Sequence, residues 1–282
     1  MVMETRVLVA SDVHLCHLVW NGIKAEDRLE NMVEKMQAYY AQKPYEMVVF
    51  LGDYSLDHWK WQVGGSWVSN GVSNTNRFCK EYASRLPVPY YMMPGNHEQY
   101  GDELWKKITG VSRQGSFVLG GYLFVCCDNF AGELDPDYHH DGVYTVTDLD
   151  FVRKAMAEHP ELPVVLCAHD FDLDKEPEEF YQFLKEEKRI TVLLQGHVHI
   201  THICELGEKA DDLCVVHAGH YAAPSGKRSV LDHMWGFLDL VLTDEGVDIC
   251  YVEPENDLEV DGQPYHHNYR EQNHRFFKRR DL

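Results

Sequence analysis

The stretch VLVASDVH, residues 7–14, places a carboxylate and an imidazole directly after a short apolar run. The uninterrupted run VLVA predicts a buried strand. In open α/β sheets, binding sites lie on the loops that follow the carboxyl ends of such strands. Asp12 and His14 are therefore candidates for a site at that edge of a sheet.

Four further motifs along the chain repeat this arrangement of an apolar run followed by polar residues. They are LGDY with Asp53, PGNHE with Asn96 and His97, CAHD with His169, and QGHVH with His197 and His199. Oxygen donors and imidazoles without a thiolate suit divalent manganese, iron or zinc in a hydrolytic centre. One such motif alone means little, but five in this order predict a single metal site.

Taken together, the motifs resemble the signature of the calcineurin-like metallophosphoesterase family, D-x-H, GD, GNH-[DE], H and GH-x-H. They stand here at 12–14, 52–53, 95–98, 169 and 196–199, with no motif residue missing. The resemblance covers roughly the first 200 to 250 residues, as one domain of that size can. It implies an α/β fold, namely a four-layer α/β/β/α sandwich of two mixed β-sheets flanked by helices.

The resemblance also implies two divalent metal ions that share one carboxylate. Such a pair clamps the attacking and leaving oxygens at phosphorus. The implied activity is hydrolysis of a phosphomonoester or phosphodiester by attack of a metal-bound hydroxide. The ligands that the resemblance assigns are Asp12, His14, Asp53 and His199 for one ion, and Asp53, Asn96, His169 and His197 for the other.

His97 is the predicted catalytic residue, because in the family the corresponding histidine lies beside the leaving group. A partly protonated imidazole can give a proton to a departing alkoxide near neutral pH. Glu98 or another carboxylate is a candidate to orient the ring. The alternative is that His97 only hydrogen-bonds a backbone carbonyl near the metals.

Residues next to the motifs have less certain roles. His197 and His199 project together only if the backbone turns between them, and we expect Gly196 to permit that turn. Asp170 is a candidate to orient a ligand or, equally, a turn residue. The other histidines within or near the motifs are expected at the surface or behind the ligands, with one or two of them lining the pocket. They are His17, His58, His202, His217 and His220.

A long connection at residues 54–74 holds three of the six tryptophans. Long loops without regular structure inside a compact domain are often functional lids. His58, Trp59 and Trp61 are therefore candidate substrate-binding residues, with the tryptophans able to stack an aryl group or a nucleobase. The alternative is that the tryptophans pack on their own domain.

The charge of the chain narrows the class of substrate. With 26 basic and 46 acidic residues the formal net charge is −20, which disfavours long nucleic acid as a partner. We therefore expect a small phosphorylated substrate. The alternatives are a nuclease and a non-catalytic metal-binding scaffold of the same fold. Purple acid phosphatases lack a histidine in the first motif, whereas His14 is present here.

Hydrophobic patterning predicts alternating strands and helices as far as residue 195, followed by strands at 199–205, 213–217, 235–242 and 247–252. We expect one metallophosphoesterase domain at 1–252 and an extension or tail at 253–282. The first strand begins almost at once, so no signal peptide is expected, and no apolar stretch approaches the roughly 20 residues that span a bilayer. The sequence thus predicts a cytoplasmic protein without a membrane anchor.

Overall fold

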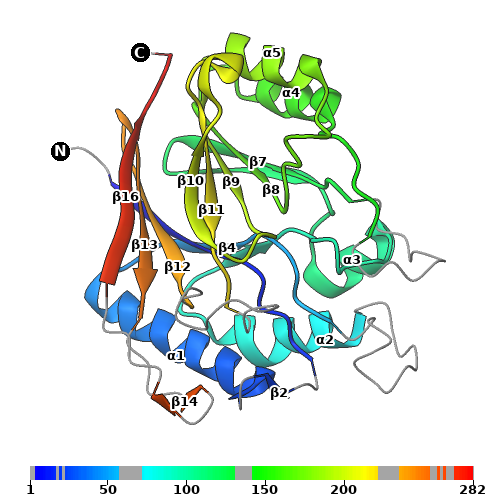
Figure 1. Ribbon diagram of the computed structural model, residues 1–282, viewed down its shortest axis with the longest axis vertical. Coiled ribbons are helices and arrows are strands. Elements are labelled where there is room, and N and C mark those ends of the chain that lie inside the picture. Colours follow the sequence, from blue (N-terminus) through cyan, green and yellow to red (C-terminus); the bar gives the residue numbers. More distant parts are fainter. Residues whose placement is uncertain are drawn as a thin grey trace.

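The computed structural model describes residues 4–16, 19–20, 23–56, 72–130, 142–221, 235–254, 259–260, 263–264 and 270–281. Two six-stranded sheets form the middle of the molecule, and helices cover their outer faces (Figure 1). The expected sandwich of two mixed sheets flanked by helices is therefore confirmed. The labels below follow Figure 1.

The first sheet combines a parallel half with an antiparallel half. Its strand order is β16-β13-β12-β1-β4-β5. In this sheet β1, β4 and β5 are parallel to one another, and β12 pairs with β1 in antiparallel register. The strands are β1 (Thr5–Ala10), β4 (Met47–Phe50), β5 (Tyr90–Met92), β12 (Phe237–Leu242), β13 (Gly246–Glu253) and β16 (Arg270–Lys278).

The second sheet has the order β10-β11-β9-β8-β7-β6. The four inner strands are parallel, and each edge strand is antiparallel to its neighbour. The strands are β6 (Gly115–Leu119), β7 (Tyr122–Cys127), β8 (Val164–Ala168), β9 (Ile190–Gln195), β10 (Thr201–Glu205) and β11 (Cys214–Ala218). The apolar run at residues 117–127, broken at Gly120-Gly121, predicts a hairpin, and the pairing of β6 with β7 confirms it.

Helices lie on the two outer faces, and no helix among the described residues has both the length and the apolar character needed to cross a membrane. In Figure 1, α1 and α2 lie along one face of the sandwich, and α4 and α5 lie on the opposite face. The helices are α1 (Ala25–Gln42), α2 (Val72–Arg77), α3 (Asp102–Thr109), α4 (Leu149–Glu158) and α5 (Glu178–Glu186). The minor elements are a π-helical turn (Phe78–Tyr82), 3₁₀ turns (Ala83–Arg85 and Gly207–Ala210), and the short pairs β2 (Val19–Trp20) with β3 (Ile23–Lys24) and β14 (Glu259–Val260) with β15 (Gln263–Pro264).

Three hydrophobic cores separate the four layers. Successive side chains of a strand point to opposite faces of its sheet. Accordingly, Val7 and Val9 of β1 face the core between the sheets, while Leu8 and Ala10 face the core beneath α1. A third core lies between the second sheet and the helices α4 and α5. Because both faces of each central strand are buried, the strands are largely apolar runs, with a buried exception in Asp239 of β12.

Three local features differ from what the sequence pattern indicates. The residues Thr147-Asp148-Leu149-Asp150 match a capping box, which predicts Thr147 as the N-cap of α4. The cap is instead Asp148, whose side chain accepts the N–H of Phe151 at 3.0 Å. The Thr147 hydroxyl is bonded to Glu176 instead. The pattern predicts neither α3 nor β16. The division of the chain at residue 252 stays a prediction.

Candidate metal centre

The polar residues of the five motifs converge at the carboxyl ends of the parallel strands of both sheets. Backbone hydrogen bonds join their loops: the N–H of Asp12 donates to the Gly52 carbonyl at 3.1 Å, and the N–H of Gly196 donates to the His169 carbonyl at 2.9 Å. One side chain links the two sheets, because Asp12 Oδ2 accepts the N–H of His197 at 2.9 Å. The sandwich therefore brings all five motifs to one place.

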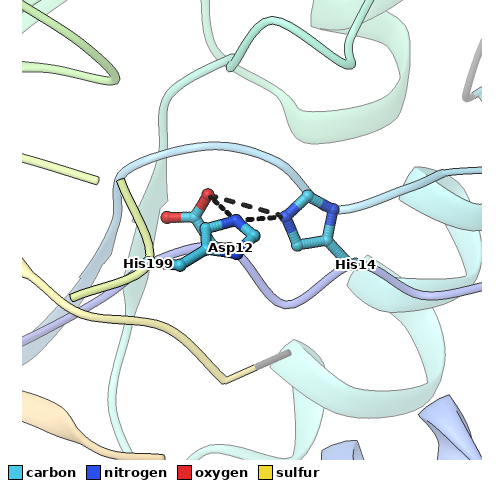
Figure 2. A group of neighbouring side chains, drawn as sticks. All are labelled: Asp12, His14 and His199. Atoms are coloured by element: carbon cyan, nitrogen blue, oxygen red, sulfur yellow. Dashed lines mark hydrogen bonds and ion pairs between the residues drawn. The ribbon is translucent and has the colours of Figure 1, made fainter. Parts of the chain in front are cut away.

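The first group of potential ligands consists of Asp12, His14 and His199 (Figure 2). Asp12 Oδ1 lies 3.1 Å from Nε2 of His199 and 3.6 Å from Nε2 of His14. The two imidazole Nε2 atoms are only 2.9 Å apart. Two ring nitrogens at this distance repel one another unless a proton or a cation lies between them. This donor set therefore fits a divalent ion.

The second group consists of Asp53, His169 and His197, with Asn96 between the two imidazoles. Asn96 Oδ1 lies 2.9 Å from Nε2 of His169 and 3.0 Å from Nδ1 of His197. The other nitrogen of His169, Nδ1, donates to the Leu51 carbonyl at 2.7 Å, since a carbonyl can only accept. That bond directs Nε2 of His169 toward the oxygen atoms of Asn96 and Asp53, which suits a metal ligand.

Asp53 lies between the two groups. Its Oδ2 atom is 3.2 Å from Nε2 of His169 and 3.7 Å from Nε2 of His14. The same oxygen is 3.6 Å from Nε2 of His97. The position of this carboxylate next to imidazoles of both groups is what a bridging ligand requires.

The electrostatic environment lowers the pKa values of Asp12 and Asp53 and keeps both carboxylates ionised. Burial raises the pKa of Asp53, but the imidazoles of His169 and His97 outweigh it and hold the pKa below its usual range. Burial also lowers the pKa of His169, but the Asp53 carboxylate outweighs this effect and raises the pKa to about 10. Burial lowers the pKa of His14. The centre thus combines buried negative charge with one imidazole whose pKa is lowered, His14, and one whose pKa is raised, His169.

Five of the motif residues adopt a left-handed backbone that side-chain-bearing residues seldom adopt. Their φ angles are 54° at Asp12, 44° at His14, 61° at Asp53, 64° at His197 and 56° at His199. Such a conformation costs about 1–3 kcal/mol per residue and is concentrated at functional sites. Among the other described non-glycine residues, only Asp211 and Asp212 share it.

Gly196 has a different role from the one expected. The turn that brings His197 and His199 together is made by the left-handed backbone of these two histidines, and φ of Gly196 is not positive. A Cβ atom at Gly196 would overlap with Ser11 Oγ and approach Asp12 Oδ2. Glycine is therefore required for the close approach of the two loops.

Glu98 ties two motif loops together through their backbones. Its fully buried carboxylate accepts the N–H groups of Gly95 at 2.7 Å, Asp53 at 2.9 Å and Tyr54 at 2.9 Å. The sequence suggested Glu98 as a group that orients His97, but these bonds make it a support for the loop that carries Asp53. The carboxylate 3.6 Å from His97 Nε2 is that of Asp53.

Further side chains surround the centre. The Phe130 ring lies with its centroid 5.8 Å from that of His169 and 6.2 Å from that of His197, a position that no motif indicates. His220, expected near the site, stacks on His199 at 5.3 Å. Asp170 Oδ2 lies 4.0 Å from His197 Nε2. The predicted substrate-binding residues His58, Trp59 and Trp61 lie outside the described residues.

Solved structures with this fold include PhoD, a purple acid phosphatase and an NAD nucleotidase. PhoD has a TM-score of 0.63 at 10% sequence identity, over 98% of this chain and 70% of PhoD. Purple acid phosphatase PPD1 from yellow lupin (Lupinus luteus) seeds has a TM-score of 0.55 at 14% identity, over 94% of this chain and 53% of the phosphatase. NAD nucleotidase (NadN) of Haemophilus influenzae has a TM-score of 0.51 at 13% identity, over 88% of this chain and 55% of NadN.

At these identities the likeness shows the fold alone, and the chain spans about half the length of the lupin phosphatase and of NadN. No curated protein matches the chain in sequence. A family model described as calcineurin-like phosphoesterase matches residues 5–201, which is more than half of the chain and includes every motif. The chain therefore belongs to the calcineurin-like phosphoesterase family.

Proposed function

We propose that this protein is a dimetal-dependent hydrolase that cleaves a phosphomonoester or phosphodiester bond of a small substrate. The observation that carries the proposal is the position of Asp53 between two groups of buried and half-buried ligand residues, with a further imidazole, His97, 3.6 Å from the same carboxylate. A structural role for these polar residues would not require both clusters to share one carboxylate.

The chain offers a complete set of residues for two ions of manganese, iron or zinc. Two such ions bound together polarise the phosphoryl group and clamp the attacking and leaving oxygens. Asp53 would be the shared ligand. Asp12, His14 and His199 would complete one set, and Asn96, His169 and His197 would complete the other. The neutral Asn96 amide limits the negative charge of the site.

His97 is the proposed proton donor. Its side chain is buried, and its ring lies 5.2 Å from the His14 ring, which places it next to the metal ligands. Its backbone N–H donates to Asp53 Oδ1 at 3.1 Å, so that the position of His97 depends on the shared carboxylate. As the bond from phosphorus to the leaving oxygen breaks, His97 would give its proton to that oxygen.

Charge and the intact motifs support this reading over its two rivals. A net charge of −20 opposes the binding of a long polyanion, which disfavours a nuclease. A non-catalytic scaffold needs no proton donor, whereas this chain has His97 and every ligand residue of the motifs. A cytoplasmic location stays a prediction from the sequence.

Metal analysis combined with a substrate panel tests the proposal. We expect two ions per chain after incubation with manganese, and turnover of either nitrophenyl phosphate or bis(nitrophenyl) phosphate. The Asp53→Ala variant is the control for contaminating phosphatases. Two bound ions without turnover of any monoester or diester would favour a scaffold, and turnover restricted to oligonucleotides would favour a nuclease.

A further inference from the structure

Arg113 is a buried arginine outside the five motifs, on the connection between α3 and β6, with 5% of its surface exposed. Its Nη1 atom donates to the carbonyl oxygens of Glu98 at 2.8 Å and Tyr100 at 2.9 Å. Glu98 directly follows His97 in the chain. Arg113 therefore holds the backbone of the loop that carries the proposed proton donor.

The rest of the guanidinium group is paired with a carboxylate. Arg113 Nε lies 2.6 Å from Asp128 Oδ2, and Nη2 lies 3.1 Å from Asp128 Oδ1. This bidentate arrangement is directional and stronger than a single neutral hydrogen bond. Asp128 Oδ1 also accepts the N–H of Phe130, whose ring lies against His169. The ion pair thus connects the His97 loop to Phe130, whose ring lies beside His169 and His197.

Glu98 is held from two sides. Its carboxylate is bonded to the backbone of the Asp53 loop, and its carbonyl is bonded to Arg113. A shift of that carbonyl would change the backbone torsions of Glu98, and the preceding peptide bond joins Glu98 directly to His97. The carboxylate bonds fix the loop relative to the metal ligands, and Arg113 fixes the segment that follows His97.

We propose that Arg113, held by Asp128, is a positioning residue that keeps the His97 imidazole in place for proton donation to the leaving group. This inference rests on the proposed phosphoesterase activity. It assigns a catalytic contribution to an ion pair that touches neither a metal ligand side chain nor the reacting atoms.

Arg189 provides a matched control. It also pairs with a carboxylate through two nitrogens, at 3.1 and 3.2 Å from Glu187, and donates to two carbonyls, those of Met156 and His159. It precedes β9 and therefore lies at the amino end of the sheet, away from the metal centre. Arg113→Lys and Arg189→Lys remove the same bidentate fork at two places.

The first readout is the dependence of rate on the leaving group. Arg113→Lys should slow an alkyl phosphate ester by about 10-fold or more and a nitrophenyl ester by less than about 3-fold, with metal content near wild type. In a His97→Ala background the same substitution should add less than about 3-fold, because residues that act as a unit are not additive. Arg189→Lys should leave both rates unchanged. Equal losses on both esters, or a full loss in the His97→Ala background, would overturn the inference.

The second readout needs no turnover. Proton–nitrogen correlation spectra of the imidazole rings identify His97 as the signal lost in His97→Ala. Arg113→Lys should shift or broaden that signal, whereas Arg189→Lys should not, and an unchanged signal would overturn the positioning role even if no substrate is cleaved. If Arg113→Lys does not fold, Asp128→Asn is measured in the same way. Failure of the phosphoesterase proposal would instead appear as absence of turnover in the wild-type protein.

Discussion

The two halves of the candidate metal centre differ in the protonation of their imidazoles. In the half formed by Asp12, His14 and His199, two ring nitrogens face each other at 2.9 Å, and burial lowers the pKa of His14. In the half that contains His169, the neighbouring Asp53 carboxylate overcomes the effect of burial and raises the pKa of that imidazole to about 10. A proton can thus take the place of a cation in the second half more readily than in the first.

One centre can therefore contain a site in which the metal replaces a proton and a site in which it does not. Metal ligands must be deprotonated, so the binding of an ion to His169 requires the release of its proton. His14 has little proton to release above neutral pH. The following predictions test this contrast, in order of decreasing effect.

Removal of the shared carboxylate should leave both halves of the centre without a metal ion. Asp53→Ala should lose both ions and all measurable metal-dependent hydrolysis, because Asp53 is next to imidazoles of both groups. Elemental analysis measures the ions. Asp212→Ala is the matched control, since Asp212 has a similar left-handed φ of 57° and is exposed. Two ions retained in Asp53→Ala would show that this carboxylate does not bridge.

Removal of one imidazole should separate the halves. His199→Ala should retain only the ion held with His169, and His197→Ala should retain only the ion held with His14, so that each variant binds one ion per chain. Titration with manganese, followed by elemental analysis after desalting, counts the ions. Loss of both ions in either variant would mean that the two halves form only together.

His97→Ala tests whether His97 belongs to a metal group or acts on the substrate, because its Nε2 atom lies 3.6 Å from Asp53 Oδ2. We expect both ions to stay bound. The rate on an alkyl phosphate ester should fall by about 10²–10⁴-fold, the usual contribution of a general acid, with a much smaller loss on a nitrophenyl ester. Steady-state kinetics on the two esters measures the difference. A loss of metal would assign His97 to the ligands instead.

The smallest predicted effect is on the pH dependence of metal affinity. The pKa of His169 is raised from 6.5 to about 10, so its proton stabilises the metal-free fold fully below pH 6.5, and this contribution is lost as pH rises through 10. Metal affinity in His199→Ala should accordingly rise about tenfold per pH unit in the lower part of this range, since one proton is displaced. Affinity in His197→Ala should change less. Calorimetric titrations at several pH values measure both affinities. If the metal affinities of the two variants changed equally with pH, the two halves would not differ in proton release.

The sequence predicts the parts of the centre that depend on local patterns. Each motif follows an apolar run, and the parallel strands of one sheet bring their carboxyl ends to one edge, so the convergence of Asp12 with Asp53 follows from the alternation of strands and helices. His169 follows a strand of the second sheet, and its approach to these residues depends on how the two sheets pack. The family resemblance adds which residues share an ion. The loop at residues 54–74 remains a prediction from composition, since its tryptophans lie outside the described residues.

The remaining features depend on contacts between distant segments, which no local pattern encodes. The backbone of Asp12 is left-handed, and its carbonyl accepts the N–H of Tyr221, more than 200 positions along the chain. Arg113 and Phe130 reach the centre through Asp128, which has no motif around it. The strand β16 pairs with β13 across a register irregularity, and its sequence shows no clear alternation.

The central place of β1 in the first sheet leaves one of its edges unpaired during synthesis. This strand precedes the other strands of its sheet in the chain, yet one of its two neighbours, β12, is made about 230 residues later, as the pairing of Leu8 with Asp239 shows. Until then, one edge of β1 is unpaired and the loop with Asp12 lacks its contact with Tyr221. Pairings at such long sequence separation slow folding and leave strand edges open to aggregation. The edge of β1 is therefore open to pairing with other chains until β12 has been made.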